Sequence, residues 1–269
     1  MSIDKLVNDE MAKKRFERTL IIPDIHAPYE DYRALHAIYK MAKKEDFDKV
    51  KIMGDLVDFY QLSKFSKDPK RITGLQQEID VAQYHLDKLR KVHKGDITLF
   101  EGNHEYRLKK YLMENPEMSS LKKINNIPSL LDLDEYGIKY KHHEMFHGVL
   151  IKHGNLVRQQ SAYTAKGEFD REGTSGISGH THRLGSYYVS NRGGAHAWFE
   201  MGHLCDEKAA EYMEGKVPNW QKGFGVMTYD TKTDTWRIEQ VPIIKNSFMF
   251  NNNVYKWRSN QKYVGRERL

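Results

Sequence analysis

The sequence predicts a layered α/β protein built on a largely parallel sheet. Short apolar runs, of the kind found in buried strands, occur at 19–23, 50–53 and 96–100. Each run is followed by a segment with apolar residues at helical spacing, at 31–44, 75–93 and 105–113. Strands that alternate with helices in this way are typical of a parallel sheet covered by helices.

The second half of the chain is richer in short strands. We expect one helix at 159–168, and strands at 148–152, 175–179, 185–190, 195–201, 223–229 and 235–242. The polar stretch 230–234 is expected to form the turn between the last two strands. We expect these strands to form a second sheet that packs on the first, rather than an independent domain.

Length and composition favour one large domain. The chain has 269 residues, 39% of them hydrophobic, which is enough for a core and excludes wholesale disorder. We expect a single domain over 18–254, with a charged lead-in at 1–17 and a basic tail at 255–269. Stretches without clear periodicity are expected to be surface insertions, at 60–74, 114–135 and 204–222.

Cysteine content and hydropathy exclude several classes of protein. Cys205 is the one cysteine, so a secreted scaffold held by intramolecular disulfides is excluded. No window approaches the ~18 consecutive apolar residues of a membrane-spanning helix. We therefore expect no membrane partner and a cytoplasmic location. The net charge of +6 favours anionic partners, and the sequence leaves the oligomeric state open.

Metal-ligand side chains follow the strands expected in the core. They are Asp24 and His26, Asp55 and Asp58, Asn103 to Glu105, His153, and finally His180 and His182. One Asp-x-His triplet is expected about once by chance in such a composition. Five ligand-type clusters in order, each at the carboxyl end of a predicted strand, are not expected by chance. The sequence therefore predicts one composite site.

The donor types indicate which metals the site would bind. Carboxylates, an amide oxygen and imidazoles suit Mn²⁺, Fe or Zn²⁺ better than Ca²⁺, and the lack of thiolate excludes a cysteine-type structural zinc site. Seven ligands are too many for one tetrahedral ion but suit two ions that share a carboxylate. The i, i+2 spacing of Asp24 and His26, repeated in His180 and His182, points both side chains to one side in extended backbone.

These motifs resemble those of the calcineurin-like metallophosphoesterases over about residues 20–185. The motifs are Asp24-Ile-His26, Gly54-Asp55-Leu-Val-Asp58, Gly102-Asn103-His104-Glu105, His153-Gly154 and Gly179-His180-Thr-His182. The resemblance implies a four-layer α/β/β/α sandwich, with two mixed sheets flanked by helices. It also implies a phosphoester substrate and two divalent metal ions, of which we expect Mn²⁺ first, with Fe, Zn²⁺, Ni²⁺ or Mg²⁺ as alternatives.

The resemblance further implies a role for each residue. One metal would be held by Asp24, His26 and His182, and the other by Asn103, His153 and His180, with Asp55 as the bridge. A metal-bridging hydroxide would attack phosphorus in line, and His104, oriented by Asp58, would act as general acid without ligating a metal. We expect Glu105 to fix its loop rather than to act in catalysis.

The residues beside the motifs bear on the substrate. In the protein-phosphatase branch of the family Arg-Gly directly follows the second Asp of Gly-Asp-x-x-Asp, where this chain has Phe59-Tyr60. An aromatic pair suits a base or a sugar. We therefore expect a phosphodiesterase or nuclease acting on nucleotides or nucleic acid. The candidate substrate contacts are Phe59, Tyr60, Lys64, Arg107 and Arg183. The alternatives are a phosphomonoesterase, either a nucleotidase or, less favoured, a protein Ser/Thr phosphatase, and a non-catalytic binding module.

Several other features have plainer interpretations. The basic residues of 60–74 and 255–269 could contact nucleic acid, or could form a solvated rim and a packed tail. Arg107 and Arg183 could instead form surface ion pairs. A polar turn explains the cluster of His142, His143 and His147 better than a further metal site does, and His196 and His203 could line the cleft.

Overall fold

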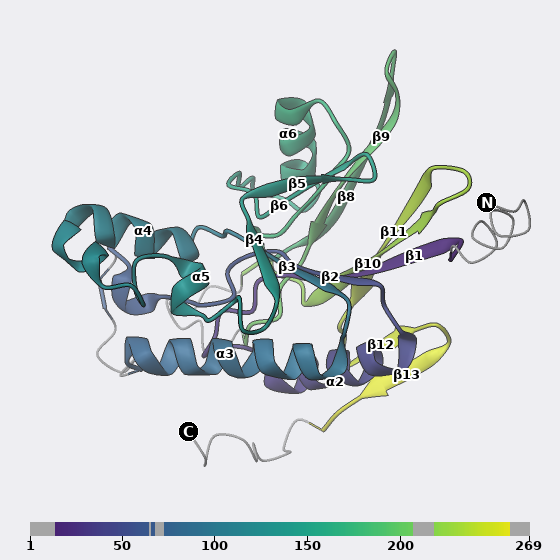
Figure 1. The fold of residues 1–269 in the computed structure, drawn as a ribbon. Coiled ribbons are helices and arrows are strands. Elements are labelled where there is room, and N and C mark those ends of the chain that lie inside the picture. Colours follow the sequence, from purple (N-terminus) through teal and green to yellow (C-terminus); the bar gives the residue numbers. More distant parts are fainter. Residues whose placement is uncertain (1–13, 65, 68–72, 207–217, 259–269) are drawn as a thin grey trace, which may run out of the picture.

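The structure is a computed structural model that describes residues 14–64, 66–67, 73–206 and 218–258 (Figure 1). The strands of its first sheet are β1 (Phe16–Ile22), β2 (Lys49–Ile52), β3 (Asp96–Phe100), β4 (Ile138–Lys141), β10 (Gly223–Asp230) and β11 (Thr235–Pro242). Their order is β11-β10-β1-β2-β3-β4. β1 to β4 pair in parallel, whereas β10 pairs antiparallel with both β1 and β11.

Two long helices, α2 (Tyr32–Glu45) and α3 (Leu75–Val92), lie together along one face of this sheet (Figure 1). The Asp31 side chain caps α2 by accepting a hydrogen bond from the backbone N of Ala34, at 3.2 Å. Both helices bury their apolar stripes against the sheet, and that contact forms the main hydrophobic cluster of the molecule.

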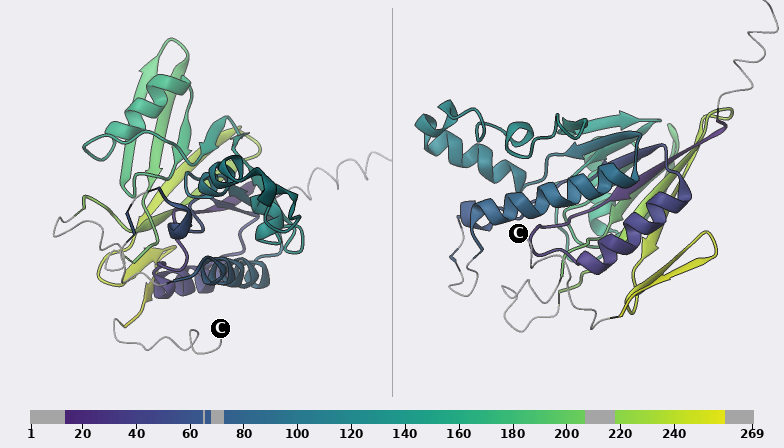
Figure 2. Two further views of the ribbon diagram at one scale, coloured as in Figure 1. Left: turned by 90° about the vertical axis from the view of Figure 1, so that its left-hand side faces the viewer. Right: turned by 60° about the horizontal axis from the view of Figure 1, so that its bottom comes forward.

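The second sheet has five strands and one covering helix. The strands are β5 (His143–Phe146), β6 (Val149–Lys152), β7 (Gly176–Ser178), β8 (Leu184–Asn191) and β9 (Gly194–Met201). Their order is β5-β6-β7-β9-β8. The helix α6 (Tyr163–Glu172) packs on the outer face, where Phe169 and Ala165 meet Leu150 and Trp198. Both views in Figure 2 show this sheet lying against the first one.

Strict alternation along the strands produces the layers. In β1, Leu20 and Ile22 face the helices α2 and α3, while Ile21 between them packs in the core between the two sheets. In β6, Val149 and Ile151 join that inter-sheet core and Leu150 faces α6. Successive side chains of a strand point to opposite faces, so each central strand is apolar on both sides. The predicted four-layer α/β/β/α sandwich is confirmed.

The strands predicted at 223–229 and 235–242 form as β10 and β11, but they lie in the first sheet. The expectation that they belong to the second sheet is therefore wrong. β10 pairs along β1 from Phe16 opposite Asp230 to Ile21 opposite Gly225. An apolar run predicts a strand but does not distinguish between two sheets that both bury a face. The turn at 230–234 is confirmed by the pairing of Asp230 with Thr235.

Several elements were not predicted. β4, β5 and the hairpin of β12 (Ser247–Phe250) and β13 (Asn253–Lys256) lie outside the predicted strands. The stretch 114–135 holds the short helices η2 (Pro116–Ser120) and α5 (Ile127–Leu130), and its leucines at 130, 131 and 133 are buried in the core. Residues 127–133 therefore pack against the core, whereas residues 114–126 are exposed or half-buried. Most of the expected lead-in and tail, 1–13 and 259–269, lies outside the described residues.

The helix predicted at 159–168 is α6, which begins four residues later, at Tyr163. A buried carboxylate determines the start, because Glu200 accepts hydrogen bonds from the backbone N of Ala162 and Ala165. Over the described ranges, the helices lack the combination of length and apolar composition that a membrane crossing requires.

Candidate active site

The predicted ligands lie at the carboxyl ends of β1, β2, β3, β6 and β7, where the two sheets meet. Figure 2 (left) views the molecule from this end. Parallel strands end at the same edge of a sheet, so their loops converge there. The structure brings Asp24, His26, Asp55, Asn103, His153, His180 and His182 together at this edge.

The first ligand set consists of Asp24, His26 and His182, all buried. The Nε2 of His182 lies 2.9 Å from the Nε2 of His26 and 3.3 Å from Oδ2 of Asp24. The other oxygen of Asp24, Oδ1, is buried, and within the described part of the chain it has no hydrogen-bond partner. Two imidazole nitrogens and a carboxylate that face one another are the donors that a divalent cation takes.

The second set consists of Asp55, His153 and His180, joined by Asn103. The Nε2 of His153 lies 3.0 Å from Oδ1 of Asn103 and 3.3 Å from Oδ2 of Asp55. The Nδ1 of His153 donates to the carbonyl of Met53, which fixes Nε2 toward the site. Because Oδ2 of Asp55 also lies 3.7 Å from Nε2 of His26, this carboxylate lies between the two sets.

The charges of the site fit cations. Burial alone would raise the pKa of Asp55, but the surrounding histidines hold it well below its ordinary value. Burial would lower the pKa of His153, yet the charge of Asp55 raises it to about 10. Burial lowers the pKa of His182 to about 4, so this imidazole is a neutral donor. His182 is therefore in the neutral state that a metal ligand requires, whereas the protonated His153 carries positive charge beside Asp55 and must release its proton when an ion binds.

The backbone of the ligands differs from the extended conformation that the sequence suggested. His26, Asp55, His180 and His182 have φ angles of 54°, 48°, 69° and 58°. Left-handed conformations of this kind cost about 1–3 kcal/mol per residue and are retained where the surroundings fix them. Here the backbone N of His26 donates to the carbonyl of Asp55, and that of His180 donates to Oδ2 of Asp24. The ligands therefore converge through turns, not through strands.

Glu105 holds the two central loops together. Its carboxylate accepts hydrogen bonds from the backbone N of Asp55, Leu56, Val57 and Gly102, at 2.8–3.2 Å. The loops approach so closely that a Cβ added to Gly102 would lie 2.2 Å from Oδ1 of Asp55. These contacts confirm the expectation that Glu105 fixes its loop.

His104 stands beside the ligand sets at the start of α4 (Glu105–Glu114). Its Nδ1 lies 2.6 Å from the carbonyl oxygen of Asp58 and 3.0 Å from Oδ1 of the same residue. Hydrogen bonds with His104 and His26 lower the pKa of Asp58 against the effect of burial. His26, Asp58 and His104 also lie close enough to form a ligand set, but the Nδ1 of His104 is directed to Asp58.

The candidate substrate contacts lie in different surroundings. Phe59 is 0% exposed and packs in the main core, so its ring does not face the site and the prediction that it contacts substrate is wrong. Tyr60, in the short helix η1 (Tyr60–Leu62), is half-buried, with Nζ of Lys67 5.2 Å from its ring centre. Lys64 is exposed and pairs with Glu114.

The two candidate arginines also differ. Arg107 donates from Nη1 to the carbonyl of Asp58, at 2.8 Å, and from Nη2 to Nε2 of His104, at 3.0 Å. Arg183 donates to the carbonyls of Asn219 and Arg158 and so joins two loops. Of the two, Arg107 is the one in contact with the predicted catalytic residues.

Two residues beside the site were not predicted. Glu78 in α3 is fully buried and accepts a hydrogen bond from the backbone N of Tyr60 at 3.2 Å, beneath the turn that follows Asp58. In the sequence Glu78 looks like an ordinary acidic residue in the first turn of a helix, so no sequence signal indicates that it lies beside the site. Trp220 places its ring edge-on to His182, with centres 4.4 Å apart.

Taken together, the fold and the paired ligand sets define an α/β protein with a metal centre at the carboxyl ends of its strands. The sequence pattern of calcineurin-like phosphoesterases matches residues 17–184. The chain therefore belongs to the calcineurin-like phosphoesterase family and is a metal-dependent phosphoester hydrolase. The family implies a pair of divalent ions, and the donor sets fit such ions.

The Gene 54 proteins of Mycobacterium phages L5 and D29 are each 31% identical to this chain over 254 residues, covering 89% of it and 99% of their own length. Among solved structures, Vacuolar Protein Sorting 29 from Cryptosporidium parvum superposes with a TM-score of 0.42 at 13% identity, over 85% of this chain and 98% of that one. The protein TT1561 of Thermus thermophilus gives a TM-score of 0.31 at 11% identity, over 83% and 98%.

Proposed function

We propose that this chain hydrolyses phosphodiesters of nucleotides or nucleic acid at a two-metal centre, with His104 as general acid. One ion would be held by Asp24, His26 and His182, the other by Asn103, His153 and His180, and Asp55 would contact both. Two such ions, when bound, polarise phosphoryl oxygens and activate water at neutral pH. The remaining chemistry falls to the side chains of the protein.

The observation that carries the proposal is the orientation of His104. Its Nδ1 faces both the carbonyl and the carboxylate of Asp58, so the proton on Nδ1 is held there. Nε2 is the remaining nitrogen, and it lies 3.8 Å from Oδ2 of Asp55, the oxygen between the two ligand sets. A proton on Nε2 would therefore stand beside a phosphate held by both ions, where a leaving oxygen needs it.

Arg107 controls access to that proton position. Its Nη2 can only donate, so the 3.0 Å contact requires Nε2 of His104 to be an acceptor, without a proton. For His104 to act as an acid, Arg107 must turn toward another acceptor. A phosphate oxygen is such an acceptor, and arginine binds it well. Substrate binding would thus draw Arg107 away and leave Nε2 free to carry the proton.

The surroundings of Asp58 favour a phosphodiester as the substrate over a phosphorylated protein. The next residue is Phe59, whose ring lies in the core, so that position supplies no cationic clamp. Arg107 is the cationic group in contact with His104, and one cation matches the single charge of a diester. A phosphomonoesterase is the second candidate, favoured by the ability of Arg107 to bind additional phosphoryl charge.

A comparison of leaving groups tests the role of His104. His104→Ala should slow hydrolysis of a dinucleotide by ~10²–10⁴-fold, because its alkoxide leaves poorly without a proton. The same variant should slow bis-p-nitrophenyl phosphate far less, because nitrophenolate leaves unprotonated. His143→Ala, an exposed histidine on β5, is the matched control. Equal losses on both substrates would show that His104 is not the acid.

A charge reversal tests the choice of nucleic acid. Lys64→Glu with Lys67→Glu should weaken binding of a DNA or RNA oligomer more than it slows hydrolysis of the small ester, because phosphate contacts accumulate along a strand. The control pair is Lys232→Glu with Arg237→Glu, on β11 and the turn before it, near the opposite end of β1. Similar effects from both pairs would count against a nucleic-acid groove.

A further inference from the structure

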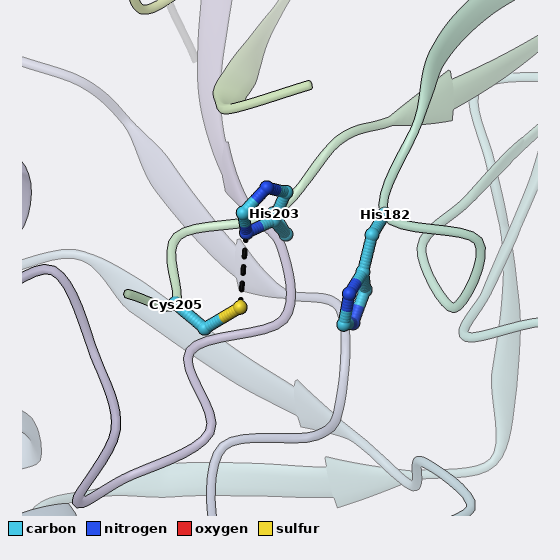
Figure 3. Close-up of side chains that lie close together, drawn as sticks. All are labelled: His182, His203 and Cys205. Atoms are coloured by element: carbon cyan, nitrogen blue, oxygen red, sulfur yellow. Dashed lines mark hydrogen bonds between the residues drawn. The ribbon is translucent and has the colours of Figure 1, made fainter. Parts of the chain in front are cut away.

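A cluster that contains the cysteine adjoins the first ligand set. His182, His203 and Cys205 are all buried, and one ligand atom of each lies within 4.8 Å of the other two. Figure 3 shows the three side chains gathered side by side, with a hydrogen bond between Nδ1 of His203 and Sγ of Cys205, at 3.0 Å. The rings of His182 and His203 are stacked, with centres 5.1 Å apart.

His182 belongs to both groups. Its Nε2 faces Asp24 and His26, as described above. Its Nδ1 is buried and has no hydrogen-bond partner among the residues that the structure describes, and His182 as a whole is 7% exposed. A histidine that ligates a metal ordinarily uses its second nitrogen to bind a neighbouring group. The first ligand set leaves this nitrogen unused.

The segment that carries the other two residues is fixed to the active site. The backbone N of Leu204 donates to the carbonyl of Asp24 at 2.9 Å, and its carbonyl accepts from the backbone N of Asp31 at 2.7 Å. The Trp220 ring packs against both histidines, at 4.4 Å from His182 and 5.6 Å from His203. The three donors are therefore held in place beneath an aromatic side chain, as a preformed metal site requires.

We propose that His182, His203 and Cys205 form a third metal site, which binds a thiophilic divalent cation such as Zn²⁺. Two imidazoles and a thiolate are donors typical of tetrahedral Zn²⁺. With Zn–N of ~2.0–2.1 Å and Zn–S of ~2.3 Å, tetrahedral ligand atoms stand ~3.3–3.6 Å apart. The contact between His203 and Cys205 would open by about half an ångström to reach this spacing, with water as the fourth ligand.

The third site would select a different ion from its neighbours. The paired ligand sets offer carboxylate, amide and imidazole donors without sulfur, a combination that suits harder ions. Only the third site offers a thiolate. When the site forms, the Cys205 thiol releases its proton to solvent as the sulfur–metal bond forms. A His182 that already holds the first catalytic ion through Nε2 also releases its Nδ1 proton, because one imidazole binds two ions only after both ring protons are lost. Binding therefore weakens as the pH falls.

The third site depends on the proposed function in one respect, which is that the first catalytic ion also binds His182. Because that ion and the Zn²⁺ of the third site would share one imidazole, Zn²⁺ in the third site should inhibit hydrolysis.

Cobalt(II) titration of the full chain under reducing conditions tests the site. A thiolate-to-cobalt charge-transfer band in the near ultraviolet arises only where sulfur binds the ion. We expect the band to appear in the parent chain, to disappear on addition of Zn²⁺, and to be absent in Cys205→Ser. His203→Ala should weaken it strongly, whereas the control His143→Ala should leave it unchanged. Far-ultraviolet circular dichroism verifies that each variant is folded.

The outcomes separate this proposal from the proposed function. A parent chain that hydrolyses phosphodiesters and shows no band would overturn the third site and leave the catalytic proposal standing. If the Asp55→Asn variant loses activity but keeps the band of the parent chain, the third site is independent of the bridging residue. A band of full strength in His203→Ala would overturn the proposed ligand set. For inhibition, added Zn²⁺ should slow the Mn²⁺-loaded parent more than Cys205→Ser, and equal inhibition would contradict the shared use of His182.

Discussion

Replacing Glu105 with Gln should damage the active site more than its small chemical change suggests. The carboxylate of Glu105 lies 1% exposed beneath the loops that carry Asp55 and Asn103. Its Oε1 accepts from the backbone N of Leu56 and Val57, and its Oε2 accepts from the backbone N of Asp55 and Gly102. A glutamine has one oxygen, so two of these four donors would face an amide NH₂ group.

The magnitude follows from those two lost acceptors. A buried N–H without a partner costs ~1–3 kcal/mol, so the variant should lose ~2–6 kcal/mol of unfolding free energy. That is a large share of the ~5–15 kcal/mol that stabilises a typical folded protein. The same loops place the ligands Asp55 and Asn103, so metal affinity should also fall. We expect the ~10–100-fold loss that is typical when a residue that orients a metal ligand is replaced.

Urea unfolding and metal titration of Glu105→Gln measure both effects. Glu117→Gln, an exposed glutamate in η2, is the matched control and should stay within ~0.5 kcal/mol of the parent. If Glu105→Gln unfolds at the same urea concentration as this control and binds metal as the parent does, then Glu105 does not hold the loops together.

Two further substitutions test the bridging role of Asp55 and the titration of Glu78. Asp55→Asn should release both ions together, because Oδ2 of Asp55 lies within 4 Å of histidines from both sets. The loss of metal affinity should exceed the ~10–100-fold typical of substitutions that only support a ligand. Elemental analysis that finds one ion retained at full affinity would refute the bridge. Burial and the nearby charge of Asp58 raise the pKa of Glu78 to about 8, so the folded chain keeps a proton that the unfolded chain releases. The unfolding free energy should therefore fall between about pH 5 and pH 8, and Glu78→Gln should remove part of that fall, on the order of a few kcal/mol. Urea unfolding at the two pH values measures this, and an unchanged difference in the variant would mean that Glu78 does not titrate there.

Much of the site could be predicted from the sequence, because strand ends can be located from apolar runs. Once the runs before Asp24, Asp55 and Asn103 are assigned to parallel strands, their carboxyl ends must meet at one edge. The backbone at the ligands could not be predicted in this way. The left-handed conformation of His26 and His182 is imposed by hydrogen bonds from other loops, which the local sequence does not encode.

The errors have a common physical origin in long-range pairing and burial. The β10 run is apolar in either sheet, and its pairing with β1 joins residues more than 200 positions apart. The position of Phe59 directly after Asp58 suggests a substrate contact, but its left-handed backbone, φ 47°, turns the ring into the core. The sequence gives no metal prediction for Cys205 because its partners, His182 and His203, come together only in the folded chain.

Two chromogenic esters test the phosphodiesterase proposal and the two-metal centre together on the Mn²⁺-loaded parent chain. Rates on bis-p-nitrophenyl phosphate and on p-nitrophenyl phosphate are measured side by side, each with and without a chelator. We expect hydrolysis that the chelator abolishes and Mn²⁺ restores, with the diester cleaved faster. Faster cleavage of the monoester would contradict the phosphodiesterase proposal, and hydrolysis that persists after metal removal would contradict the two-metal centre itself.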